Sequence, residues 1–97
     1  MRIITPRTIR EYYLSHADAE TGLERWICIA KNAEWRTLAD IKKDYNSVDY
    51  VGNSRYVFNI SGNSYRLVVL IRLLPGVIYV RWIGTHAEYD KIDCTTI

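Results

Sequence analysis

Four side chains suited to anion binding or proton transfer fall in the last third of the sequence, at Arg66, Arg81, His86 and Tyr89. Arginine binds phosphate through two parallel hydrogen bonds and keeps its charge at any relevant pH. RNA cleavage requires a proton to leave the 2′-hydroxyl, another to reach the 5′-oxygen, and stabilisation of the phosphorane charge. The sequence therefore predicts His86 and Tyr89 for the proton steps and the two arginines for the charge. This chemistry needs no metal or other cofactor.

These residues lie in or beside a predicted sheet of three strands between Arg55 and Thr85. Turn-forming residues divide the stretch at Gly62 and Asn63 and again at Pro75 and Gly76. A two-residue turn at the first position pairs Asn59 with Arg66 and Arg55 with Leu70. A two-residue turn at the second pairs Leu70 with Arg81 and Arg66 with Thr85.

This register divides the side chains between two faces, because successive residues of a strand point to opposite sides. The face that holds the candidate residues is predicted to carry Arg55, Asn59, Arg66, Arg72, Tyr79 and Arg81, with Val57, Val68, Leu70 and Ile83 between them. The other face is predicted as the core, formed by Phe58, Ile60, Tyr65, Leu67, Val69, Ile71, Ile78, Val80 and Trp82. A slip of one residue in a strand would exchange its two faces.

Helices are predicted before the sheet. Residues 2–4 suit a short strand. Thr5 followed by proline suits a helix start, with the helix ending near His16. Asp18 is the expected N-cap of a second helix that ends near Asn32. Apolar residues recur along this helix at i, i+3, i+4 and i+7, which predicts a core-facing stripe of Leu23, Trp26, Ile27 and Ala30.

Two further helix starts surround the sheet. Thr37 is expected to open a third helix, with Asp40 near its positive N-terminal end. Residues 48–51 suit a short extended piece. Thr85 and Glu88 have the spacing of a capping box, which predicts a short C-terminal helix that carries His86 and Tyr89.

Composition limits the range of functions. A chain of 97 residues predicts one domain over residues 1–97, and 48% hydrophobic content is ordinary for a globular fold. The net charge is only +2, so affinity for RNA must come from a local cluster. Cys28 and Cys94 are expected to be reduced thiols of a cytoplasmic protein. No cysteine and histidine spacing suits zinc, and no apolar run approaches the roughly 20 residues of a membrane helix.

Other interpretations of the same residues stay open. The first is a non-catalytic RNA- or ribosome-binding module that uses the same basic face. His86 would then be an inert surface residue and Tyr89 a packing residue. The second is a thiol enzyme in which Cys94 and His86 form a pair, although no third group to orient them is evident.

The segments YVFNISGNSYRLVV and YVRWIGTHAEYD closely resemble the HigB-type toxins of bacterial toxin–antitoxin modules. These toxins are ribosome-associated mRNA interferases of the RelE-like superfamily. The resemblance implies an α+β fold, with a mainly antiparallel sheet covered by N-terminal helices and a short C-terminal helix. It also implies cleavage of mRNA in the ribosomal A site, leaving a 2′,3′-cyclic phosphate or 3′-phosphate and a 5′-hydroxyl. A cognate HigA-type antitoxin, a DNA-binding helix-turn-helix protein, is the expected partner.

The resemblance also suggests a role for each candidate residue. It implies that Arg66 binds the phosphate and that Arg81 is a second transition-state contact. It makes His86 and Tyr89 the candidates for proton transfer, without deciding which is acid and which is base. The residues expected to position RNA are Arg55, Asn59 and Lys43.

Overall fold

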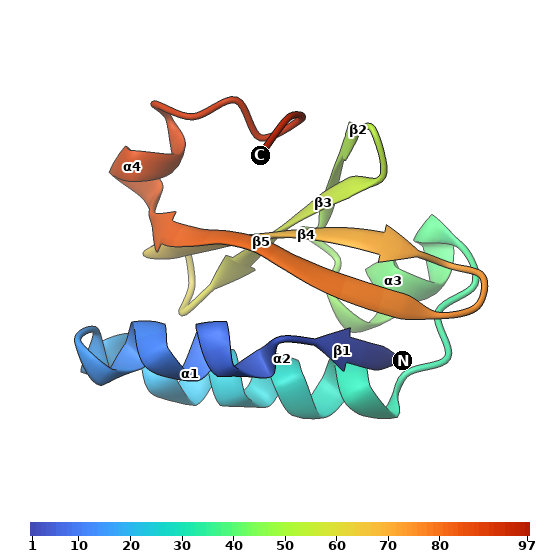
Figure 1. Ribbon diagram of the computed structural model, residues 1–97, viewed down its shortest axis with the longest axis horizontal. Coiled ribbons are helices and arrows are strands. Elements are labelled where there is room, and N and C mark those ends of the chain that lie inside the picture. The colour runs from blue at the N-terminus through green and yellow to red at the C-terminus, as the bar shows by residue number, and fades with distance from the viewer.

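Helices cover one face of a five-stranded sheet in the computed structural model, which describes all 97 residues (Figure 1). In chain order the elements are β1 (Arg2–Ile4), α1 (Pro6–Leu14), the 3₁₀ turn η1 (Ala17–Ala19), α2 (Glu20–Asn32), α3 (Leu38–Asp44), β2 (Asp49–Gly52), β3 (Arg55–Ile60), β4 (Tyr65–Arg72), β5 (Val77–Thr85) and α4 (His86–Tyr89). The strands lie in the order β1-β5-β4-β3-β2. Only β1 and β5 are parallel. The predicted α+β class is confirmed. None of the helices has both the length and the apolarity needed to cross a membrane.

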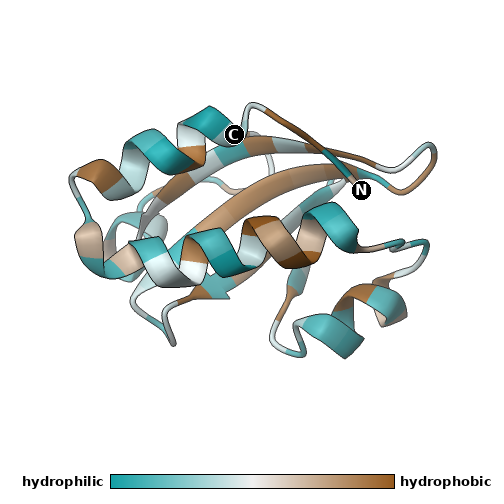
Figure 2. Ribbon diagram, turned by 90° about the horizontal axis from the view of Figure 1, so that it is seen from below, coloured by the Kyte–Doolittle hydropathy of each residue, from teal (hydrophilic) through white to brown (hydrophobic).

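The helix layer forms where the sequence predicts apolar stripes. On α2, Leu23, Trp26, Ile27 and Ala30 are all buried, as predicted. Figure 2 shows α1 and α2 side by side over the sheet, with hydrophobic strand residues behind them. The centre of this core is Phe58 of β3, whose ring packs against Trp26, Trp35 and Tyr45.

Three of the four predicted N-cap positions are confirmed, at Thr5, Thr37 and Thr85, and the one at Asp18 is wrong. Thr37 with Asp40 and Thr85 with Glu88 both form complete capping boxes. Thr5 is the N-cap of α1 with Pro6 after it, as predicted, but it makes no side-chain cap hydrogen bond and has a left-handed φ of 59°. Asp18 lies inside η1, and α2 begins only at Glu20. The Asp18 carboxylate instead accepts a 2.5 Å hydrogen bond from the Tyr65 hydroxyl, a tertiary contact that local sequence does not reveal.

The first hairpin has the predicted register. Asn59 pairs with Arg66 and Arg55 pairs with Leu70 across β3 and β4. The face of the sheet turned away from α1 and α2, called the open face below, therefore carries Arg55, Asn59 and Arg66 as predicted.

The second hairpin differs from the prediction in the length of its turn and in the register of β5 beyond Val80. A four-residue loop, not a two-residue turn, joins β4 to β5, so Leu70 pairs with Tyr79 instead of Arg81. A β-bulge then inserts Arg81 between the partners of Val69 and Val68.

An extra residue reverses the alternation of the strand beyond it. Trp82 therefore shares the open face with its partner Val68, and was wrongly predicted as core. Ile83 was predicted on the open face but packs against the core instead. Arg66 pairs with Gly84, not with Thr85.

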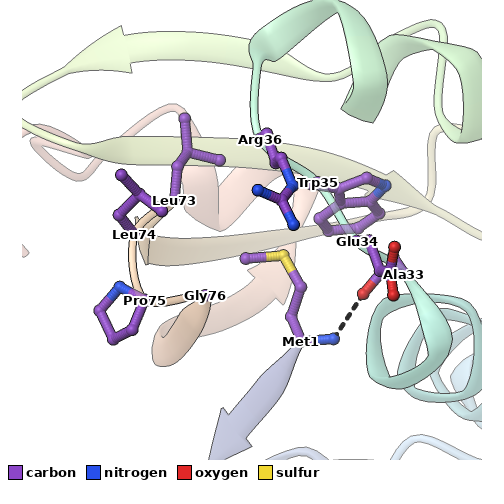
Figure 3. A pocket seen from close by; sticks show the side chains of 9 residues that line it. All are labelled: Met1, Ala33, Glu34, Trp35, Arg36, Leu73, Leu74, Pro75 and Gly76. Carbon is purple, nitrogen blue, oxygen red and sulfur yellow. Dashed lines mark hydrogen bonds between the residues drawn. The ribbon is translucent and has the colours of Figure 1, made fainter.

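The amino group of Met1 binds the end of α2. It donates to the main-chain oxygens of Ala30 at 3.0 Å, Lys31 at 3.0 Å and Ala33 at 2.7 Å. These carbonyls lie at or just beyond the C-terminal end of α2, where few intrahelical donors remain, and Ala30 O also accepts from Ala33 N at 3.2 Å. Figure 3 shows Met1 beside a hollow of about 230 Å³, which also borders the β4–β5 loop.

Gly84 is required by the position of the Trp82 indole. A Cβ at Gly84 would lie 2.3 Å from Trp82 Cη2 and 3.1 Å from Glu88 Oε1. We expect Gly84→Ala to lower the free energy of unfolding by about 1–3 kcal/mol, as overpacking commonly does. Chemical denaturation measures the loss. Adding Trp82→Leu removes the clashing ring and should recover part of the stability. Equal stability of Gly84→Ala and the unmodified chain would show that the ring moves freely aside.

Candidate active site

Three side chains meet where β4, β5 and α4 join on the open face: Arg66, Trp82 and Tyr89. The Arg66 guanidinium carbon lies 5.9 Å from the centre of the Tyr89 ring, a cation–π contact. The Trp82 and Tyr89 rings are 6.2 Å apart and tilted by 52°. Arg66 also donates to the main-chain oxygen of Asn63 at 3.1 Å, which turns its head toward the β3–β4 turn. The result is a guanidinium over the Tyr89 ring, which itself packs beside the Trp82 indole.

Tyr89 is held as a neutral proton donor. Its hydroxyl donates to Cys94 Sγ at 3.3 Å. Burial is the main cause that raises the Tyr89 pKa to about 12, with smaller contributions from Cys94 and Asp49, while Arg66 acts in the opposite direction. A phenol with so high a pKa keeps its proton at neutral pH, and its first role in proton transfer would be that of an acid.

His86 is the first residue of α4, and its side chain is 51% exposed. The Thr85 capping box fixes the start of this helix, and the His86 main-chain N–H donates to Ser64 O at 3.1 Å. The imidazole Nδ1 lies 3.4 Å from Asp90 Oδ2. His86 forms no hydrogen bond or ion pair with Arg66 or Tyr89. Its ring is thus open to solvent at the border of the site.

Arg55 and Arg81 form a second group on the open face. After α4 the chain runs back across this face (Figure 1), and both guanidiniums donate to the main-chain oxygen of Ile97. Asn53 Nδ2 adds a hydrogen bond to Thr95 O at 2.9 Å. The structure therefore brings Arg81 together with Arg55, and no direct contact joins Arg81 to Arg66.

The two remaining candidates lie further out. Asn59 is the strand partner of Arg66 and also borders a hollow of about 430 Å³ beside α2. Lys43 is exposed on α3, the helix whose Ile41 is buried in the core on the other side of the sheet. Roles in RNA positioning stay predictions for both residues.

Both cysteines are free thiols, and Cys28 is exposed. Cys94 is hydrogen-bonded to Tyr89 and makes no hydrogen bond with His86. The pair that a thiol enzyme would use is therefore not formed.

Sequence reasoning missed three contributors to the open face: Trp82, Asn53 and the main-chain oxygen of Ile97. Trp82 was assigned to the core because nothing in the sequence signals a bulge at Arg81. The contacts of Asn53 and Ile97 depend on the return of the chain after α4, for which no local pattern exists.

A sheet face that gathers arginines beside tyrosine and histidine, with helices covering the opposite face, defines a small α+β domain suited to act on phosphodiesters. Residues 19–92 match the HigB_toxin family, described as the RelE-like toxic component of a toxin–antitoxin system. The chain belongs to this family, and the resemblance seen in the sequence is confirmed.

Curated relatives carry the same family name. The chain is 24% identical over 94 residues to the mRNA interferase HigB of Escherichia coli O6:H1, covering 95% of this chain and 91% of that protein. It is 27% identical over 93 residues to the mRNA interferase toxin HigB of Escherichia coli K12, covering 93% and 88%. The mRNA interferase HigB of Shigella flexneri matches to the same extent.

The state of Tyr89 is open to direct measurement. We expect its hydroxyl to titrate near pH 12 rather than near 10, the usual value for tyrosine. Because the folded state holds this proton more tightly than the unfolded chain, Tyr89 lowers the unfolding free energy as pH rises from about 10 to about 12. NMR of ¹³Cζ-labelled tyrosine follows the titration, and Tyr89→Phe identifies the resonance. A midpoint near 10 would contradict the burial and the Cys94 hydrogen bond.

Proposed function

We propose that this toxin is an endoribonuclease that cleaves mRNA without a metal ion, with its active site around Arg66, Tyr89 and His86. The observation that carries the proposal is the Arg66 guanidinium beside the Tyr89 ring, 5.9 Å from its centre, at the base of the helix that begins with His86. The proposal is also supported by the relatives, which are named mRNA interferases.

Arg66 supplies the charge that the reaction needs. In-line attack of the 2′-hydroxyl on the adjacent phosphate gathers negative charge on the non-bridging oxygens, and a fixed guanidinium stabilises that charge. Arg66 Nη1 donates to the main-chain oxygens of Asn63 and Tyr65, so its head is held in place before RNA arrives. Arg81 adds a second positive charge to the same face, from its position beside Arg55.

Tyr89 and His86 divide the proton transfers. Tyr89 is neutral at physiological pH and is suited to donate a proton to the departing 5′-oxygen or to orient the phosphate. His86 is exposed beside Asp90, and a neutral imidazole nitrogen can accept a proton. It is therefore placed to accept the proton of the 2′-hydroxyl.

Aromatic and polar neighbours would orient the RNA. The Tyr89 ring lies beside Arg66 and next to the Trp82 indole, and unpaired RNA bases stack on such rings. Arg55 and Asn59 on the open face and Lys43 on α3 are proposed to contact the backbone.

We propose that the ribosome holds the RNA in place for this weakly charged toxin. A charge of +2 gives little general attraction for RNA, so we propose that the toxin acts on mRNA held in the ribosomal A site. As a component of a toxin–antitoxin system it has an antitoxin partner. We propose that this partner is a HigA-type helix-turn-helix protein and that the toxin acts in the cytoplasm.

Substitution of the site residues tests the proposed nuclease. On ribosome-bound mRNA, we expect Arg66→Ala to lower the cleavage rate about 10²–10³-fold through lost charge stabilisation. We expect His86→Ala to lower it about 10²–10⁴-fold through lost proton transfer. Arg7→Ala is the control, because Arg7 is an exposed arginine on α1, away from the open face. Cleavage of a short RNA free of the ribosome, by the unmodified chain at high concentration, should persist in a metal chelator.

Two results would count against this assignment. Full activity in Arg66→Ala and His86→Ala would move the active site elsewhere. When the unmodified chain is expressed in bacteria, arrested growth with intact transcripts would favour a non-catalytic module that binds RNA or the ribosome through the same face. Full activity in Cys94→Ala would separately exclude a thiol mechanism.

A further inference from the structure

Two guanidiniums from different strands point at one oxygen atom on the open face. The main-chain oxygen of Ile97 accepts from Arg55 Nε at 3.3 Å, from Arg55 Nη2 at 3.0 Å and from Arg81 Nε at 3.1 Å. Arg55 Nη1 donates to Asn53 O at 2.9 Å. The Nη1 and Nη2 groups of Arg81 have no protein partner, and this side chain is exposed. More donors thus converge here than one oxygen can satisfy.

The charge of Arg55 is the unusual element. Arg55 is the only buried charged residue of the chain, with 9% of its surface exposed. No carboxylate side chain lies within 4.0 Å of either arginine, because the ion pairs of the protein involve other residues. A buried charge is normally compensated by an opposite charge, and two cations at one acceptor repel each other. An anion with several oxygens would satisfy both guanidiniums, and phosphate fits their forked geometry.

Residues 95–97, the segment that places the Ile97 oxygen between the two arginines, are held by few contacts. Besides the two arginines, Asn53 Nδ2 binds Thr95 O, and Tyr89 binds Cys94 Sγ just before it. Asp93, just before the segment, accepts through Oδ1 from the Thr95 main-chain N–H and hydroxyl. No side chain of residues 95–97 forms an ion pair with the sheet. A phosphate, which offers several oxygens to the two guanidiniums, can therefore compete with the single Ile97 oxygen that they share.

We propose that Arg55 and Arg81 form a subsite for an RNA backbone phosphate, separate from Arg66, and that residues 95–97 occupy this subsite until RNA displaces them. The inference rests on the proposed function, since it takes RNA as the ligand. Arg66 is then the contact at the reacting phosphate, and the Arg55 and Arg81 pair holds a neighbouring stretch of backbone. The segment competes with RNA and lowers the affinity of the free toxin.

Binding of a short 2′-O-methyl RNA, which has no 2′-hydroxyl to cleave, tests this competition. We expect a chain that lacks residues 95–97 to bind about three- to tenfold more tightly than the full chain, since it loses hydrogen bonds that oppose binding. Asn53→Gly removes the side-chain hydrogen bond to Thr95 O, keeps the main-chain oxygen that accepts from Arg55 and tolerates the φ of 52° at this position, so it should act in the same direction. Fluorescence anisotropy at constant ionic strength measures both, and thermal unfolding confirms that the variants are folded.

Substitution of the arginines completes the test. Arg81→Ala should weaken binding about tenfold, and more than Arg72→Ala, a matched exposed arginine of β4 outside the subsite. In the Arg81→Ala background, removal of residues 95–97 should give a smaller gain. Arg81 is exposed, so this variant should fold even if Arg55→Ala does not.

The outcomes separate this inference from the proposed nuclease. Unchanged or weaker binding by the folded shortened chain would overturn the competition, whatever the cleavage assays show. Equal losses in Arg81→Ala and Arg72→Ala would overturn the subsite. Tighter binding after shortening, with no cleavage of ordinary mRNA by the full chain, would support the subsite and reject the nuclease.

Discussion

The β-bulge at Arg81 is the local constraint on which the open face depends. One extra residue in β5 reverses the alternation of side chains between Val80 and Trp82. Arg81 then reaches the same oxygen as Arg55, and the Trp82 indole lies over Gly84 next to Tyr89. Without the bulge, Trp82 would point into the helix-covered core. The same strand thus gives the core Ile78 and Val80, and gives the open face an arginine and an indole.

The open face combines an apolar floor with unusual charges. Val57 and Val68 are buried at 3% and 0% exposure, yet neither belongs to the core under the helices. They lie on the face that the chain crosses after α4, between the strand positions of the arginines. Apolar surroundings of this kind strengthen electrostatic interactions, so a guanidinium here binds an anion more strongly than one in water. The same surroundings keep the Tyr89 proton in place, because burial disfavours the phenolate.

Helix α4 links the reactive residues to the rest of the fold. It has only four residues and is fixed by its Thr85 capping box and by the hydrogen bond from His86 N to Ser64 O. That hydrogen bond ties the start of α4 to the β3–β4 turn, and Arg66 leans toward the same turn through Asn63 O. The position of His86 therefore depends on the β3–β4 turn, which is distant from it in sequence. The placement of Arg66 beside Tyr89 depends on the same turn.

The sequence by itself determined the elements whose signals are local. The apolar stripe of α2, the capping boxes at Thr37 and Thr85, and the pairing of Asn59 with Arg66 all follow from spacing and turn chemistry over a few residues. The residue types at Arg66, His86 and Tyr89 pointed to RNA chemistry, and their motifs identified the family.

The tertiary structure alone decided which side chains share the open face beyond the first hairpin. A bulge changes the direction of every later side chain in its strand and leaves no reliable trace in composition, so Trp82 and Ile83 were assigned to the wrong faces. The cap expected at Asp18 is not formed, and the Asp18 carboxylate instead accepts a hydrogen bond from the Tyr65 hydroxyl. The joining of Arg55 and Arg81 at Ile97 spans 42 residues of sequence, and such contacts arise only when the whole sheet is assembled.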